Sequence, residues 1–329
     1  MRRFAAWAMG GMLLACGGGA ETRETTSGER VEIPGESATS YATAPTSGGV
    51  LGSVGTEEVR RGVERAAADA GNPLVPDGRL AELASWIGGQ LGPGGAPPPH
   101  PVIELFTRSL GLVEPAPHLA VLGVPDVSAL EAGVADAVRG FLARQPYGAW
   151  GAAVVERGGL NVAVLVLSTR ALDLEPVARR HEVGARVALR GRLHDGFRTP
   201  QLALAPPNGE VRRLPLGPGP EFTTDLTLTS AGAWRVEVLA QGSRGDTVVA
   251  NFRSTSEDPP RFVEMRGDDG PTTTTTRPRA SSALFRRLND ARAREGVPPS
   301  VAHPPRGGLA RAQPRHGRAP LRGHTADHG

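Results

Sequence analysis

The side chain with the most specific chemistry in this sequence is the thiol of Cys16, the only cysteine in the chain. Two arginines follow Met1, the next nine residues are mostly apolar, and small residues precede the cysteine. This order is typical of a secretory signal. The apolar run is too short to cross a bilayer, which requires about 20 residues. We therefore expect export, with cleavage between Ala15 and Cys16.

A cysteine at the cleavage point resembles the signal of bacterial lipoproteins, which are cut before a cysteine that carries the lipid. The resemblance implies that residues 1–15 are removed and that the protein binds the membrane through lipid on Cys16. One acyl chain anchors only reversibly, whereas several chains hold stably. Gly17 stands where an aspartate would favour the inner membrane. We therefore expect a lipid-anchored protein of the cell envelope, at the outer membrane.

Other reactive side chains lack the partners that catalysis or metal binding requires. The C-terminal pair His324-x3-His328 has a spacing that could bind zinc in a helix, but glycines flank it. Ser243 lies in an expected turn, and the chain contains no G-x-S-x-G motif. Glu156 has no recognisable carboxylate partner on a facing element. We therefore expect no catalytic residue, no metal and no cofactor.

The charge distribution argues against a nucleic-acid partner. All 37 basic residues are arginine, there are 34 acidic residues, and the net charge is +3. Abundant Ala, Gly, Pro and Arg fit a GC-rich genome, and no basic stretch alternates with aromatics. The excess of positive charge lies in residues 283–329, which hold nine arginines and three acidic residues. A single cysteine excludes disulfides within the chain, so stability must come from apolar packing.

The first half of the chain predicts a tether followed by an α/β domain. Residues 16–55 are rich in Gly, Ser, Thr and Glu, which favours a flexible tether. In residues 56–170, apolar side chains recur first at helical spacing, and a buried strand is expected over 119–124. Two apolar runs joined by Gly158-Gly159 predict a hairpin. Helices beside a small sheet predict a layered α/β/α sandwich.

The second half predicts strands and then irregular segments. Between residues 180 and 256, six or seven short runs alternate apolar and polar side chains, separated by turns such as Asn208-Gly209. This spacing predicts a β-sandwich of immunoglobulin-like type. Residues 257–282 are a Thr/Pro linker, and residues 283–329 begin with one helix before prolines break the pattern. The expected fold class is α+β, with disordered N- and C-terminal segments.

Two segments of the sequence echo each other, and the second resembles a known family. Residues 58–84 and 283–310 both show a helical pattern, a glycine stop and a turn containing proline. In the second copy, L-N-D-A-R at 288–292 and G-V-P-P at 296–299 match the opening of a bacterial CAP domain, of the cysteine-rich secretory, antigen 5 and pathogenesis-related superfamily. His324 stands about where the first cavity histidine of that family would be.

The resemblance implies a degenerate CAP-like domain at 56–170 and a truncated CAP start at 283–329. His100 falls near the cavity position of the first copy by spacing alone. The first copy lacks a G-E-N motif and an aromatic-rich final strand, so the resemblance implies the fold and an extracytoplasmic setting but no activity. Either a shifted reading frame or a disordered extension would explain residues 297–329.

These patterns favour a non-enzymatic role in binding or structure at the cell surface. We expect a monomer whose ligand belongs to the cell wall or to a surface protein. The alternative is a hydrolase-like CAP protein whose catalytic C-terminal domain is missing from this chain. A passive surface coat protein is the third interpretation.

Overall fold

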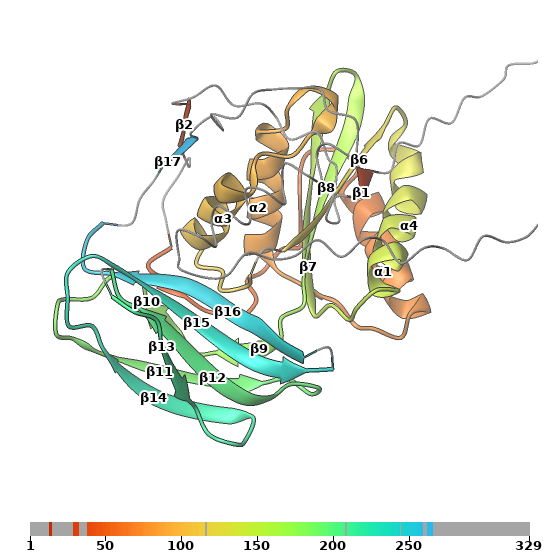
Figure 1. Ribbon diagram of the computed structural model, residues 1–329. Helices are drawn as coiled ribbons and strands as arrows, with labels where there is room; N and C mark the ends of the chain where they lie inside the picture. The colour runs from red at the N-terminus through yellow and green to blue at the C-terminus, as the bar shows by residue number, and fades with distance from the viewer. Residues whose placement is uncertain are drawn as a thin grey trace, which may run out of the picture. The chain divides into compact units, whose positions relative to one another are not determined.

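The structure of the protein is a computed structural model with both helices and many strands, which makes the fold mixed α+β (Figure 1). It describes residues 13–14, 29–32, 38–115, 117–207, 209–243, 245–258 and 262–265. The helices lie in the first part of the chain, and the second part contains only strands among the residues described there.

The α/β part contains one mixed sheet and all of the described helices. The helices are α1 (Thr56–Asp69), α2 (Gly78–Gly89), η1 (Pro93–Gly95), α3 (His100–Ser109), η2 (Val127–Ala129) and α4 (Leu130–Leu142). The strands are β1 (Leu13–Leu14), β4 (Val50–Leu51), β5 (Val75–Pro76), β6 (His118–Val124), β7 (Ala149–Arg157) and β8 (Leu160–Ser168). In the sheet, β6, β8 and β7 pair antiparallel, β1 pairs antiparallel with β6, and β4 and β5 run parallel to β7.

Helices cover both faces of this sheet because its central strand is apolar on both sides. In β8, Val162, Val164 and Val166 pack with α2 and α3. The intervening Ala163, Leu165 and Leu167 pack with α1 and α4. Successive side chains of a strand point to opposite faces, so one continuous apolar run serves two cores. Figure 1 shows α1 and α4 on one side of the sheet and α2 and α3 on the other.

Two glycines allow close approach between elements of this part. A Cβ on Gly62 of α1 would lie 2.6 Å from the backbone oxygen of Glu131 in α4. A Cβ on Gly151 of β7 would meet the backbone of Leu80 and Ala81 in α2. Only glycine allows these backbones to come this close.

The β-rich part is built from two antiparallel sheets that share one core. One sheet has the order β14-β11-β9 and the other β13-β12-β15-β16. Their strands are β9 (Leu172–Leu174), β11 (Arg186–Leu193), β12 (Arg198–Ala205), β13 (Arg212–Pro215), β14 (Glu221–Thr227), β15 (Ala233–Gly242) and β16 (Gly245–Thr255). Trp234, Val236 and Val238 point into the core, whereas Arg235 is exposed, as the period of two predicts.

The helices and strands predicted within residues 56–255 are present, whereas the helix expected at the start of residues 283–329 lies outside the described residues. Several connections differ from expectation. Residues 38–55, assigned to the flexible tether, belong to the fold: Tyr41 is buried in the core of the β-rich part. β3 (Ser40–Tyr41) pairs with β10 (Val177–Ala178). Within the expected linker, β17 (Phe262–Met265) pairs with β2 (Glu29–Glu32). These pairings join distant segments, so composition and periodicity within one segment give no sign of them.

The edge of β16 that does not pair with β15 accepts cover from segments outside the two sheets, through backbone hydrogen bonds. The backbone N–H of Asn251 donates to the carbonyl of Val113 at 2.7 Å. Further along, the N–H of Thr255 donates to the carbonyl of Arg179 at 3.0 Å. Covering an edge strand satisfies its hydrogen-bonding groups and blocks pairing with other chains. The α/β and β-rich parts belong to one compact unit.

Candidate functional site

Buried charges surround the start of α2. Asp77 is fully buried and caps this helix, because its Oδ1 accepts a hydrogen bond from the backbone N–H of Arg79 at 3.0 Å. Nη2 of Arg170 donates to Oδ2 of Asp77 at 2.6 Å and to Oε1 of Glu114 at 2.8 Å. Nη2 of Arg79 lies 3.1 Å from Oδ2 of Asp77. We call these four residues the Arg170 cluster.

The Arg170 cluster holds its charges in place through its own contacts. Burial alone would raise the pKa of Asp77, but hydrogen bonds from Arg79 and Arg170 outweigh burial and lower that pKa below its usual value. Burial alone would lower the pKa of Arg170, but Glu114 and Asp77 outweigh it and raise that pKa. Asp77 and Arg170 are therefore both ionised at neutral pH. The ion pairs of Asp77 with Arg79 and Arg170, and of Arg170 with Glu114, join three segments of the chain, so the cluster is suited to fixing these backbone segments.

The segments fixed by the cluster also form the wall of a cavity of about 460 Å³. Pro115, which follows Glu114, lines the cavity, and so do Thr169 and Ala171, which flank Arg170. The strand-rich part contributes the turn at Asp195–Phe197, between β11 and β12, and the turn between β15 and β16. This volume lies within the range of about 300–1,000 Å³ that is typical of small-molecule sites.

The cavity combines apolar walls with a small number of polar groups. Its apolar lining includes Pro115, Ala171, Phe197, Val248 and Val249. The polar lining includes His118, Gln145, Thr169, Asp195, Ser243 and Asp246. Such a balance gives affinity through burial of apolar surface and orientation through a few hydrogen bonds.

Of the ionisable side chains in the described lining of the cavity, His118 is the least exposed. It is the first residue of β6 and is half-buried, with its ring centroid 5.4 Å from that of Tyr147 and 6.1 Å from that of Phe141. Burial lowers the pKa of His118, and the positive charge of Arg144 lowers it further. The imidazole is therefore neutral at pH 7 and offers one N–H donor and one acceptor.

Backbone strain converges on the same cavity. In the described part of the chain, Arg170 (φ 40°) and Thr199 (φ 49°) are the non-glycine residues with positive φ. Arg170 stands between two lining residues, and Thr199 follows the lining residue Phe197 by two positions, inside a β-bulge of β12. Positive φ is unfavourable for side-chain-bearing residues, most of all for a β-branched one such as threonine. Such strain tends to collect at functional sites.

The residues singled out by the sequence do not form this site. Ala15, Cys16 and His324 lie outside the residues that the structure describes. His100 is the first residue of α3 and is exposed, and it is not part of the cavity lining. Ser243 does lie in the predicted turn, which is part of the lining.

The sequence missed His118 and the Arg170 cluster. His118 looks like a loop histidine because prolines precede it nearby, yet it opens a strand. The sequence around Asp77 indicates only a helix cap, and Asp77 is the N-cap of α2. Arg170 lies 93 positions from Asp77 and 56 from Glu114, so no local spacing could reveal their contact.

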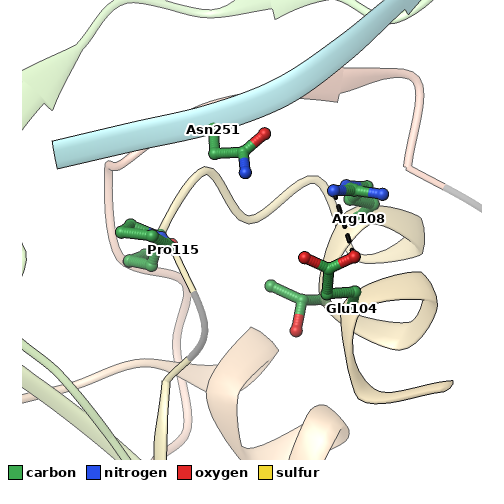
Figure 2. A pocket seen from close by; sticks show the side chains of 6 residues that line it. Glu104, Arg108, Pro115 and Asn251 are labelled. Carbon is green, nitrogen blue, oxygen red and sulfur yellow. Dashed lines mark ion pairs between the residues drawn. The ribbon is translucent and has the colours of Figure 1, made fainter. Parts of the chain in front are cut away.

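Two other hollows are less suited to a ligand. Figure 2 shows the first, a cavity of about 10 Å³ near the ion pair between Glu104 and Arg108, whose side chains are 3.3 Å apart. That volume is about the size of one water molecule. The second hollow involves only residues 156–161, at the tip of the hairpin between β7 and β8. A single hairpin provides no facing wall.

Comparison of the sequence with models of known protein families and with curated proteins finds no match. No helix among the described residues is long and apolar enough to cross a membrane. The same residues contain no group of three or more His, Cys, Asp or Glu side chains placed to hold a metal ion. We call the cavity of about 460 Å³ the His118 cavity, and its role is inferred from the chemistry of its lining residues.

Proposed function

We propose that this protein is a lipid-anchored protein of the cell envelope that binds a ligand at the cell surface without catalysing a reaction. The observation that carries the binding role is the His118 cavity, with its volume of about 460 Å³, apolar walls and few polar groups. The strained residues beside it support this role, because strain costs stability and is retained where a particular wall shape is needed.

The geometry favours recognition over catalysis. Nucleophilic or acid–base catalysis needs a reactive group held by a hydrogen-bonded partner, as in a Ser-His or His-carboxylate pair. In the described structure, Ser243 and His118 both line the cavity, but no hydrogen bond links either of them to the other or to a carboxylate there. A neutral imidazole without such a partner serves well as a hydrogen-bonding group for a ligand.

The family resemblance suggests how the binding module is built. A CAP-like domain implies helices on both faces of a sheet that ends in a hairpin, and α1 to α4 with β7 and β8 have this arrangement. An immunoglobulin-like sandwich implies two antiparallel sheets over one core, as in residues 172–255. We propose that the two form one binding unit with the cavity between their contributing segments.

Lipid on Cys16 would hold this unit at the membrane surface. The support is the order of basic residues, apolar run and cysteine in residues 1–16. In a bacterial host, the full chain is expected in the membrane fraction, and the Cys16→Ser variant in the soluble fraction or as uncleaved precursor. Immunoblotting of the fractions, with mass measurement of the extracted protein, checks this. A Cys16→Ser variant that is processed and retained like the native chain would contradict lipid anchoring.

The binding role is tested by co-sedimentation of the detergent-extracted full chain with purified cell-wall sacculi. The native chain should sediment with the sacculi, whereas Ser243→Trp should not, because the exposed turn residue would place an indole in the cavity. This substitution leaves the net charge unchanged, so non-specific attraction of a basic chain is the same for both proteins. Failure of the native chain to sediment with the sacculi would contradict a cell-wall ligand for this cavity.

A further inference from the structure

The outer strands of the three larger sheets are protected against pairing with other chains, with one exception. In the β-rich part, β13 carries Arg212, Arg213 and Pro215, and β14 carries the exposed acidic residues Glu221 and Asp225. In the same part, β9 is three residues long, and backbone groups from outside the sheet cover β16. In the α/β part, β4 and β5 cover the outer edge of β7. Charge, proline, short length and cover are the usual means of protecting an edge.

The exception is β6, at the other edge of the sheet in the α/β part. Its sequence is H-L-A-V-L-G-V, which contains no proline and no side chain that is charged at pH 7. All seven residues pair with β8 without a shift of register, so the strand has no bulge. A long, regular and uncharged edge of this kind readily pairs with another strand.

Among the described residues, one strand pairs with the outer edge of β6, and it comes from the signal segment. The antiparallel register places Leu13 opposite Val121 and continues at Leu14 (Figure 1). The proposed lipoprotein processing removes residues 1–15 and therefore removes both leucines. After cleavage, β1 is absent, and the outward backbone groups at Ala120 and Val121 lose their partner.

We propose that the outer edge of β6 accepts an extended, apolar segment of a partner protein as an added antiparallel strand. In this mode of recognition, backbone hydrogen bonds supply affinity and side chains at alternate positions supply specificity. β6 offers no charge to an acidic or basic segment, and the strand paired with it in the structure consists of two leucines. The proposal goes beyond ligand binding in the His118 cavity, and it rests on the proposed processing, because the signal segment occupies the edge before cleavage.

The probe is a peptide with the sequence of residues 9–16 and the change Cys16→Ser. Its binding to the mature chain, extracted in detergent from bacterial membranes, is measured by fluorescence anisotropy, with protein-free micelles as the blank. A second peptide is N-methylated at Leu13 and Leu14, which keeps every side chain but removes two backbone donors. The unmodified peptide should bind at least about tenfold more tightly, because strand pairing needs these donors.

Hydrogen exchange followed by mass spectrometry locates the bound peptide on the chain. The unmodified peptide should slow the exchange of backbone amides in residues 118–124, whereas the methylated peptide should not. The mass of the extracted chain shows whether residues 1–15 have been removed.

The variants Gly123→Lys and Gly140→Lys add the same charge at two different places. Gly123 is exposed in β6, and a Cβ there would lie 3.4 Å from Cδ1 of Leu160, which is an ordinary contact. Gly140 lies in the last turn of α4, where a Cβ would meet nothing within 4 Å. A lysine on an edge strand opposes pairing, so Gly123→Lys should weaken peptide binding severalfold and Gly140→Lys should leave it unchanged. Thermal unfolding of each variant confirms that it is folded.

The contrary outcomes each overturn a different part of the proposal. Equal binding of the two peptides, or slowed exchange only outside residues 118–124, would show that β6 is not the acceptor edge. A dimer in which residues 118–124 are protected without peptide would show that a second copy occupies the edge. An extracted chain that retains residues 1–15 would overturn the proposal together with the proposed processing. If the processed chain binds sacculi but shows no preference between the peptides, the binding function stands and this proposal fails.

Discussion

At the scale of single residues, the central feature is a strained arginine held between two buried carboxylates. Arg170 has a φ of 40° and pairs with Asp77 and Glu114 while flanking two residues of the cavity wall. An arginine whose backbone is strained can persist only if its surroundings fix it. The Arg170 cluster provides that fixation, and the residues next to Arg170 and Glu114 in the chain line the cavity.

Replacing the arginine should be costly to stability. Arg170→Met removes the guanidinium and leaves Asp77 and Glu114 buried with one partner fewer. Breaking a buried ion pair in this way destabilises a protein by about 3–5 kcal/mol. Urea unfolding measures the loss, and Arg157→Met, at an exposed position, should change stability by less than about 0.5 kcal/mol. Equal effects of the two substitutions would show that the cluster does not hold the wall.

At the scale of elements, two glycines in helices distinguish the effect of helix propensity on stability from the effect of packing between helices. Gly62 lies in the middle of α1, and Gly140 lies in the last turn of α4. A Cβ on Gly62 would lie 2.6 Å from the backbone oxygen of Glu131 and 2.9 Å from Cγ1 of Val134, whereas a Cβ on Gly140 would meet nothing within 4 Å. The contact between α1 and α4 therefore depends on the missing side chain of Gly62.

Alanine at these two positions should have effects of opposite sign. Gly140→Ala should stabilise the protein by about 1 kcal/mol, because alanine is the better helix former. Gly62→Ala should destabilise it by about 1–3 kcal/mol, because the new methyl group pushes α4 away. Denaturant unfolding of both variants checks the signs. Stabilisation by both would mean that the helices are not in close contact at Gly62.

The elements themselves were largely predictable from periodicity. The helical spacing around Val59, Leu83 and Phe106 and the alternation around Trp234 each reflect burial of one face, which the structure confirms. Segment 38–55 was not predictable, because one large side chain, Tyr41, carries most of its burial. One apolar residue gives no repeating pattern from which a buried element could be predicted.

At the scale of the whole molecule, the important contacts join segments that are distant in sequence. Val113 covers the edge of β16 at Asn251, β2 pairs with β17, and the cavity lining extends from Pro115 to Val249. Local patterns indicate that a segment is a strand or a turn, but not which distant segment it meets. For this reason, spacing in the sequence indicated the wrong histidine: His100 is exposed, and the histidine that lines the cavity is His118.

Binding at the His118 cavity is tested most directly by the equilibrium binding of the full chain to purified sacculi, compared among three proteins. The native chain and His100→Ala should bind alike, because His100 lies outside the cavity lining. Ser243→Trp should bind about tenfold more weakly or worse, a loss of about 1.4 kcal/mol. Equal binding by the native chain and Ser243→Trp would contradict the claim that the His118 cavity is where this protein binds its ligand.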